Sequence, residues 1–253
     1  MREGKLKVTL LAHSQLSEDF RNMLSDEAIN TIVEKNVTDG QVLALTAIRN
    51  CYSHLEPTEI ANAEAARYFG RAATDGKGGS EADRLFRHIT GSGHTSTLEH
   101  ISFTFSIEDF SRAGMAQLTR HRVGYSFSIK SQRYVRFGSN DKAQGAKFAV
   151  PFSVLKKGEE AIKTFEKGMQ QAQAMYDALR ELGVTAEDAR AVLPNAATTS
   201  IVMTVNLTSL LTFYRKRRKG NGAQAEIAEL AEQLRSAVER VEPWTASYFD
   251  AAK

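Results

Sequence analysis

Hydrophobic and polar residues alternate along this chain with two periods, one typical of strands and one typical of helices. Residues 101–108 (Ile-Ser-Phe-Thr-Phe-Ser-Ile-Glu) alternate strictly, which predicts a strand with one buried face. Residues 7–12 and 198–205 are rich in Val, Leu, Ile and Thr and predict two further strands. Helical spacing predicts helices up to about residue 35 and at 41–53, 58–73, 81–89, 109–120, 156–182, from 185, at 207–219 and at 223–241.

Capping residues predict where several of these helices begin. Thr58, directly after Pro57, is expected to cap the helix that follows it, and Asp109 is expected to cap the helix that ends near Arg120. Thr185 opens a sequence that resembles a capping box.

These elements predict one domain over residues 1–253. We expect the α/β (α+β) class, with a mixed β-sheet flanked by helices and a long helical segment in the C-terminal half. A Gly-rich turn is expected at 75–80, and no repeat or linker is evident. Hydrophobic content of 42% and charged content of 25% are ordinary for a globular protein. No apolar run is long enough for a membrane span, and no signal-type apolar core follows the N-terminus, so a cytoplasmic setting is expected.

The single cysteine, Cys51, excludes an intramolecular disulfide and any Cys-rich zinc site. It lies in an apolar-periodic stretch, where a cysteine is most often a small buried hydrophobic residue. A catalytic thiolate is the alternative, and it needs a nearby cation or a helix N-terminus. Cys51 comes late in its predicted helix, where the dipole opposes a thiolate, so the structural interpretation is favoured.

A basic segment lies between Ser111 and Asn140, with six Lys or Arg residues and no Asp or Glu. Guanidinium groups bind phosphate as planar forks, and Ser and Gln add neutral hydrogen bonds beside them. The segment therefore predicts a site for a phosphorylated or otherwise anionic ligand. The net charge of the whole chain is only +3, which argues against general nucleic-acid binding, because that function usually needs a strongly basic domain.

Polar residues also gather in three other segments, at 91–100, 187–194 and 206–224. Taken singly, each has an ordinary explanation. The basic run at 215–219 is also typical of a solvated helix face. Arg190 can pair with Glu187 on the same helix face. His94 and His100 lack a spacing typical of metal ligands, so no metal site is predicted.

Together and in this order, the clusters resemble the flavin-dependent thymidylate synthases. The signature of that family is an Arg-His-Arg triplet followed after a short spacer by Ser-x-Arg-Tyr, matched here by Arg120-His121-Arg122 and Ser131-Gln132-Arg133-Tyr134. The resemblance runs from about residue 44 to the C-terminus. The other matches are Cys51-Tyr52-Ser53, Gly93-His94-Thr95-Ser96, Glu99-His100, Ser111-Arg112-Ala113, Gln117, Ala189–Pro194, Asn206 and Ala223–Ile227.

The resemblance implies a reaction, its cofactors and an assembly. Enzymes of this family make dTMP from dUMP, with 5,10-methylenetetrahydrofolate as carbon donor and NADPH as reductant through FAD. The resemblance implies a homotetramer whose subunits have a mixed sheet flanked by helices. FAD and dUMP are expected to bind where these subunits meet. Neither a nucleic acid nor a membrane is implied as a partner. Reduced flavin replaces a protein nucleophile, which agrees with a structural Cys51.

The resemblance also implies residue roles. The residues expected to bind FAD are Ser96, Glu99, Arg120, His121, Arg122, Ile129, Asn206, Thr208 and Thr212. The residues expected to bind dUMP are Gln117, Arg120, Ser131, Gln132, Arg133, Arg190 and Arg217. His94 is expected near the reacting face of the flavin. The triplet would neutralise the pyrophosphate of FAD and favour the anionic reduced flavin.

One arginine of the 215–219 run is expected to approach the uracil and to stabilise negative charge on its ring. The family's residue spacing, counted forward from Asn206, selects Arg217. The same spacing counted back from Ala223 selects Arg218, so both assignments stay open.

Four departures from the family pattern qualify these roles. The spacer between Arg122 and Ser131 has eight residues where seven are usual, and Gly124 can absorb the additional one. Ile129 stands where Glu or Gln is common, so this position offers only backbone groups. Thr208 replaces a usual Arg. A His or Arg is also missing at Asn221 or Gly222.

Two alternatives follow from the same residues. A nucleic-acid-binding protein would use the basic residues at 112–136 and 215–219, but it would not explain Glu99, Gln117 or the Ser-Gln-Arg-Tyr order. The second alternative is a flavoprotein that has lost synthase activity because of the four departures from the family pattern.

Overall fold

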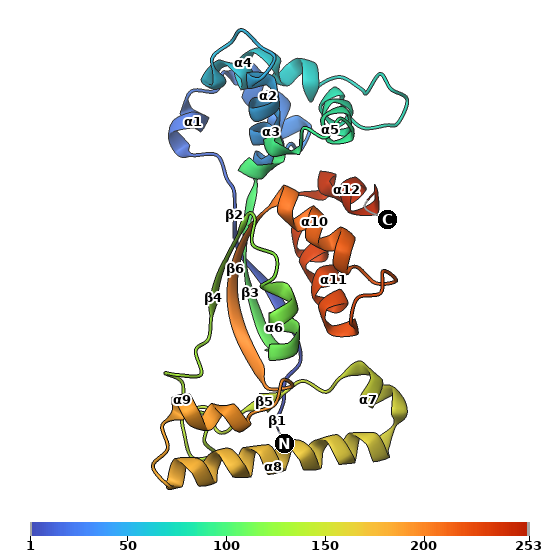
Figure 1. Cartoon of the computed structure of the whole chain (residues 1–253). Coiled ribbons are helices and arrows are strands. Elements are labelled where there is room, and N and C mark those ends of the chain that lie inside the picture. Colours follow the sequence, from blue (N-terminus) through green and yellow to red (C-terminus); the bar gives the residue numbers. More distant parts are fainter. Residues whose placement is uncertain (1, 252–253) are drawn as a thin grey trace. The chain divides into compact units, whose positions relative to one another are not determined.

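The larger sheet of the fold has four antiparallel strands in the order β2-β3-β6-β4 (Figure 1). In chain order these strands are β2 (Lys7–His13), β3 (Ser102–Ser111), β4 (Tyr125–Ile129) and β6 (Thr198–Asn206). From Ser102 to Glu108 every second side chain of β3 is buried, namely Phe103, Phe105 and Ile107, which confirms the strand predicted from the alternation. The strands expected at 7–12 and 198–205 are confirmed too. The sequence pattern did not predict β4, although its Tyr-Ser-Phe-Ser-Ile sequence has the same two-residue period.

The structure is a computed structural model that describes residues 2–251. The chain divides into two units, each of which is described here by itself. Unit 1 comprises the residues up to Leu11, Phe105–Thr204 and Phe213–Leu234. Unit 2 comprises Ala12–Thr104, Val205–Thr212 and the residues from Arg235 onward.

Unit 1 contains a second, two-stranded sheet and the longest helix. The strands β1 (Arg2–Glu3) and β5 (Lys147–Phe148) pair in parallel. The expected long helix is confirmed as α8, but it begins after Gly158, whose φ of 90° is left-handed and separates α8 from α7. The helical segments of this unit are α6 (Arg112–Leu118), α7 (Phe152–Lys157), α8 (Glu159–Glu181), α9 (Ala186–Ala189), η2 (Arg190–Val192) and most of α11 (Ala225–Glu239).

Unit 2 is built mainly from helices that pack on α3. Val42, Leu45 and Ile48 recur at helical spacing on α3 and are fully buried, and α3 contacts α4, α5 and η1. The helical segments are α1 (Glu18–Asn22), α2 (Asp26–Glu34), α3 (Asp39–Asn50), α4 (Pro57–Tyr68), α5 (Glu81–Gly91), η1 (Thr95–His100), η3 (Pro243–Thr245), α12 (Ala246–Ala251) and the start of α10 (Leu207–Arg217).

Two predicted helix caps are wrong. The cap of α4 is Glu56 rather than Thr58, because Pro57 takes the first helical position, where a proline needs no hydrogen-bond donor. The cap of α6 is Ser111 rather than Asp109, and its hydroxyl accepts from the Gly114 N–H at 2.9 Å. Asp109 instead lies inside β3 at a left-handed φ of 54°.

The cap predicted at Thr185 is correct in position, since Thr185 is the N-cap of α9. Its hydroxyl lies 3.1 Å from the carboxylate of Asp188 and does not bond the helix backbone. Only the start of α9 is therefore confirmed, and the capping box is not formed.

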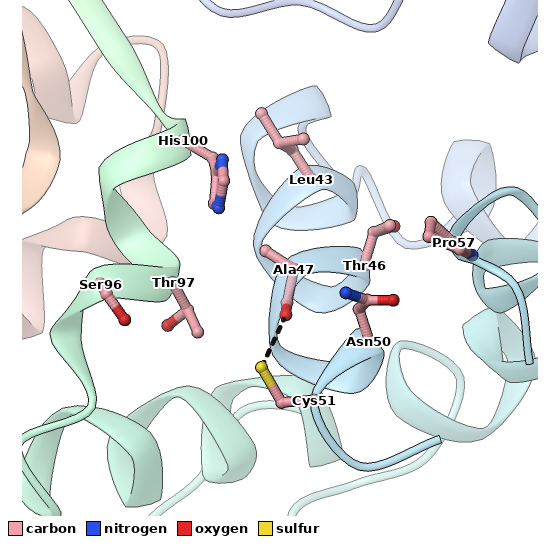
Figure 2. Close-up of a pocket in the computed structure, with 9 residues that line it drawn as sticks. All are labelled: Leu43, Thr46, Ala47, Asn50, Cys51, Pro57, Ser96, Thr97 and His100. Carbon is pink, nitrogen blue, oxygen red and sulfur yellow. Dashed lines mark hydrogen bonds between the residues drawn. The ribbon is translucent and has the colours of Figure 1, made fainter. Parts of the chain in front are cut away.

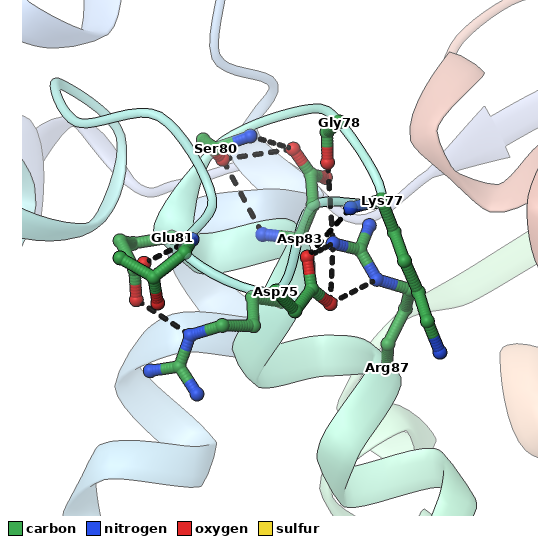
Figure 3. Close-up of polar contacts among 9 residues, drawn as sticks. Asp75, Lys77, Gly78, Ser80, Glu81, Asp83 and Arg87 are labelled. Carbon is green, nitrogen blue, oxygen red and sulfur yellow. Dashed lines mark hydrogen bonds and ion pairs between the residues drawn. The ribbon is translucent and has the colours of Figure 1, made fainter.

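The Gly-rich turn expected at 75–80 is confirmed and leads into α5 (Figure 3). Gly76, Gly78 and Gly79 all have a left-handed φ, which glycine adopts without steric cost. The Asp75 carboxylate accepts from the Arg87 guanidinium at 2.9 Å and closes the turn onto the helix.

Within residues 2–251, no helix combines the length and the apolar character needed to cross a membrane.

Candidate functional site

In unit 1, the basic triplet lies directly after α6 and leads into β4. The helix ends at Leu118, and the turn that follows contains Gly124 at a φ of 74°, as expected for the residue that absorbs a longer spacer. The Lys130 N–H donates to the Ser200 carbonyl at 2.9 Å, which fixes the end of the spacer beside β6. Arg120 and Arg122 are exposed. Among the residues that the structure describes, neither pairs with a carboxylate, so both guanidinium groups are open to an anion.

His121, between these two arginines, is held in an aromatic environment. Its ring contacts Phe213 edge to face, with centroids 5.0 Å apart, and the Nε of Arg217 donates to its Nε2 at 3.5 Å. Burial lowers the pKa of His121, and the charges of Arg217, Lys216 and Arg120 lower this pKa further. The imidazole is therefore neutral near pH 7, and the positive charge of the triplet comes from its two arginines.

The two arginines proposed to approach the uracil differ in their contacts. Arg217 is the last residue of α10 and points to His121 of the triplet. Arg218 lies beyond the helix end, and its Nη1 donates to the carbonyl of Lys219 at 3.5 Å. Arg217 therefore contacts another predicted site residue, His121.

Gln117 lies on α6, one turn before the triplet. Its side-chain amide donates to the side chain of Gln224, just before α11. The same two helices are joined at Ser111, whose N–H donates to the Glu226 carboxylate at 2.7 Å. Gln117 is thereby held at a fixed position relative to α11, although sequence matching gave it only a role toward the substrate.

Two of the residues expected to bind dUMP, Arg133 and Arg190, meet at Glu187. The Arg133 guanidinium contacts the Glu187 carboxylate at 2.7 Å, and the Arg190 Nε donates to the Glu187 backbone carbonyl at 2.9 Å. Ser131 Oγ accepts from the Arg133 N–H at 3.2 Å and tightens the loop that presents this arginine. Gln132 is buried, so its side chain faces the interior rather than the surface.

In unit 2, the predicted flavin residues lie on η1 and on the start of α10. His94, Ser96 and Glu99 are exposed on or beside η1, and the Nδ1 of His94 lies 3.0 Å from the Tyr52 hydroxyl. The Thr208 hydroxyl donates to the Thr95 carbonyl at 2.7 Å, which joins α10 to η1.

The remaining polar groups at the start of α10 bond within the helix. Asn206 Oδ1 accepts from the Ser209 N–H at 2.8 Å and acts as a helix cap. The Thr212 hydroxyl donates to the Thr208 carbonyl at 3.0 Å. Ile129, the last residue of β4, is half-buried and belongs to unit 1.

A cavity of about 330 Å³ in unit 2 adjoins η1 and was missed at the sequence level (Figure 2). Ser96 lies on its wall, and Cys51 lies opposite on α3's C-terminal turn. The Thr46 hydroxyl oxygen is buried here and has no hydrogen-bond partner among the described residues. The full lining is Leu43, Thr46, Ala47, Asn50, Cys51, Pro57, Ser96, Thr97 and His100.

The expectation that Cys51 is buried is wrong. The residue is the C-cap of α3 and is exposed, with its Sγ 3.7 Å from the Ala47 carbonyl. The helix ends at Asn50, three residues earlier than predicted, so Cys51 lies at the end of the apolar face instead of within it. Its place at a helix C-terminus remains unfavourable for a thiolate.

Among the described residues, no group of three or more Asp, Glu, His or Cys side chains could hold a metal ion.

Comparison with known proteins identifies relatives that match most of the chain. The family model Thy1, described as "Thymidylate synthase complementing protein", matches residues 31–244. The chain is 38% identical to the flavin-dependent thymidylate synthase of Geobacter sulfurreducens over 209 residues, which cover 83% of this chain and 82% of the relative. It is 31% identical to the flavin-dependent thymidylate synthase of Haloarcula marismortui over 232 residues, covering 84% and 91% of the two chains.

Among solved structures, a similar fold is that of a UMP/dUMP methylase, PolB, from Streptomyces cacaoi, crystallised with 5-Br dUMP. The TM-score is 0.69 at 21% identity, and the match covers 98% of this chain and 96% of that one. At this identity the similarity establishes the fold alone.

Proposed function

This chain belongs to the Thy1 family of flavin-dependent thymidylate synthases, and from this premise we propose which residues bind its substrate and its flavin. The substrate is dUMP, and the product is dTMP. The observation that supports the substrate site best is the meeting of Arg133 and Arg190 at Glu187, because two guanidinium groups on one small surface match a phosphate monoester. The similar fold that was crystallised with 5-Br dUMP supports the same class of ligand.

Arg133 and Arg190 hold the phosphate of dUMP in this proposal. Arg133 exchanges its exposed ion pair with Glu187 for the phosphate, while Arg190 keeps its bond to the backbone and offers its terminal nitrogens. Ser131 orients the loop, and Gln117 contacts the nucleotide beside it. The buried side chain of Gln132 supports the conformation of this loop rather than contacting the nucleotide.

Arg217 is our choice for the arginine that acts on the uracil. It lies against neutral His121, which accepts its Nε–H and so fixes the guanidinium without cancelling its charge. A fixed cation that stabilises developing negative charge on the uracil ring is typically a large catalytic contribution in a desolvated site.

The flavin is the family's cofactor, and we propose that it is FAD. Its pyrophosphate needs cations, and Arg120 and Arg122 are exposed without carboxylate partners in the described chain. When bound, the flavin supplies the reducing equivalents for the methylation. Ser96 and Glu99 present polar groups along η1, and the start of α10 presents the backbone around Asn206 and Thr208.

His94 would face the reacting part of the site, and Tyr52 orients it. The contact of the Tyr52 hydroxyl with Nδ1 leaves the Nε2 of His94 for a ligand. We further propose NADPH as reductant and 5,10-methylenetetrahydrofolate as carbon donor. The chain would act as one domain in a cytoplasmic homotetramer, with its sites completed where subunits meet.

Activity of the purified protein tests this proposal directly. We expect flavin absorbance in the isolated protein, NADPH oxidation that is faster with dUMP, and dTMP that forms only when methylenetetrahydrofolate is present. The Arg133→Ala and Arg190→Ala variants should bind dUMP about tenfold or more weakly and retain their flavin. Bound flavin without dUMP-dependent turnover would instead identify an inactive relative. Salt-sensitive DNA binding without flavin would overturn the proposal.

A further inference from the structure

In unit 1, one carboxylate of α11 fastens the end of α10 that carries the basic run 215–219. The buried Tyr214 hydroxyl donates to both oxygens of Glu232, at 3.2 and 3.3 Å. The Lys219 N–H, beyond the last residue of α10, donates to Oε1 of the same carboxylate at 3.5 Å. Glu232 therefore holds the chain at two points, one before and one after the two candidate arginines at 217 and 218.

The charges of the basic run make such a support necessary. Five consecutive Lys and Arg side chains repel one another at the end of a helix, where the backbone frays most easily. The pKa of Lys219 is raised, first by its hydrogen bond to Glu229 and further by the charge of Glu232. The Lys219–Glu229 pair is exposed and contributes little to stability, whereas the bond of Glu232 to buried Tyr214 is better shielded from water.

The helix α11 is itself held by other elements of unit 1. The Gln117 side chain of α6 donates to Gln224, immediately before α11, and the Val8 N–H of β2 donates to the Gln233 side chain at 3.1 Å. Because Gln233 is the next residue after Glu232, the carboxylate extends from a part of α11 that is attached to the sheet. The end of α10 is thereby tied to a fixed support.

We propose that Glu232 is a positioning residue for the reaction, which fixes the end of α10 so that its arginine meets the uracil. Glu232 acts through this arginine and touches neither substrate nor flavin. A cation that is fixed before the reaction stabilises developing charge without reorganisation, and a displacement of about 1 Å can cost roughly 10²-fold in rate. The inference rests on the proposed function, in which Arg217 acts on the uracil, and it applies equally to Arg218.

The first test separates turnover from binding. Glu232→Ala should lower kcat for dTMP formation at saturating dUMP by about 10–10²-fold, because the arginine is present but no longer fixed. The dissociation constant of dUMP, measured by calorimetric titration, should stay within about threefold of the wild type, and the isolated protein should keep its flavin absorbance. A general loss of structure would instead change all three quantities.

The second test asks whether Glu232 acts through an arginine. Residues that work as one unit have non-additive effects, so Glu232→Ala should cause no further loss of kcat in an Arg217→Gln background. In an Arg218→Gln background it should cause its full loss. The reverse pattern would support the inference as well and would assign the catalytic arginine as Arg218.

Two gentler variants give the same test if Glu232→Ala does not fold. Glu232→Gln keeps one acceptor oxygen and should lose less turnover than Glu232→Ala. Tyr214→Phe keeps the buried ring, removes the hydroxyl that Glu232 accepts from, and should lower kcat by about three- to tenfold. Glu229→Gln is the matched control, since it removes the same charge one turn earlier on α11, and its kcat should stay within about twofold of the wild type.

Two outcomes would overturn the inference. An unchanged kcat in Glu232→Gln, Tyr214→Phe and a folded Glu232→Ala would mean that the arginine is held without Glu232. Additive losses in both double variants would mean that Glu232 contributes to stability alone. Wild-type protein that forms no dTMP would show that the proposed function itself fails, which differs from a loss confined to these variants.

Discussion

The side chain of Arg133 contacts the carboxylate of Glu187 at 2.7 Å, and this pair joins the Ser131–Arg133 loop to α9. Both side chains are about half exposed, at 52% and 46%. An ion pair of this exposure stabilises a fold by only ~0–1 kcal/mol. In the proposed substrate site its importance is functional, because the phosphate of dUMP would compete with Glu187 for the same guanidinium.

We expect Glu187→Gln to tighten dUMP binding and to leave the fold intact. Removing the competing carboxylate should lower the dissociation constant by roughly two- to fivefold, the equivalent of an exposed ion pair. Titration with dUMP measures this change, and urea unfolding should show stability within ~1 kcal/mol of the wild type. Glu159→Gln, which breaks the exposed pair with Lys163, is the matched control and should alter neither quantity. Weaker dUMP binding by Glu187→Gln would mean that Glu187 holds Arg133 in its binding position.

The choice between Arg217 and Arg218 can be decided by turnover. Arg217→Gln should lower kcat by about 10²–10³-fold, the usual effect of losing a fixed group that stabilises developing charge. Arg218→Gln should retain most of its activity, because Arg218 lies beyond the end of α10 and its Nη1 donates to the neighbouring Lys219 carbonyl. Steady-state dTMP formation at saturating dUMP measures both variants, with flavin absorbance as the control for cofactor loading. The reverse order of effects would transfer the role to Arg218.

Cys51→Ala should remain active. The thiol is exposed at the C-terminal end of α3, where the helix dipole disfavours a thiolate, and the flavin mechanism of the family needs no cysteine nucleophile. Turnover of dUMP should stay within about twofold of the wild type, and labelling of the wild-type thiol with a small alkylating reagent should have an equally small effect. A variant that folds, keeps its flavin and forms no dTMP would overturn this mechanism.

The periodic elements were predictable because their signal is local. The alternation in residues 101–108 and the helical spacing of Val42, Leu45 and Ile48 each depend on one face of one element. The prediction that Asp109 caps α6 failed for a different reason, and Ser111 is the cap instead. The Asp109 carboxylate is bonded by Lys147 Nζ at 2.8 Å, and a partner so distant in the chain cannot be read from local sequence.

The candidate site divides in the same way. The sequence signature predicted Arg133 and His121 as site residues, because each belongs to a motif of fixed order, and it left the choice between Arg217 and Arg218 open. It did not predict that His121 accepts from Arg217, because that contact depends on how α10 packs in the fold. The bond from Tyr214 to Glu232 was equally hidden, since it joins two helices and depends on the folded chain.

Glu242 predicts a pH dependence of stability within unit 2. Its side chain is buried, accepts from the Trp244 indole N–H at 2.6 Å and from the Thr38 hydroxyl, and keeps one oxygen without a partner in the described chain. Burial raises its pKa above the ordinary value of 4.5, against the opposing effects of these hydrogen bonds, of the Gly40 N–H and of nearby His13.

The folded protein therefore holds this proton more tightly than the unfolded chain does. The resulting stabilisation is fully present below the ordinary pKa of Glu242 and is lost as pH rises through the raised folded pKa. Urea unfolding of the wild type should show a free energy that falls over this window, and Glu242→Gln should show a shallower fall, because the amide does not titrate. Glu159→Gln, on the exposed face of α8, should keep the wild-type slope. Identical slopes for the wild type and Glu242→Gln would mean that the carboxyl is ionised in the folded protein as readily as in the unfolded chain.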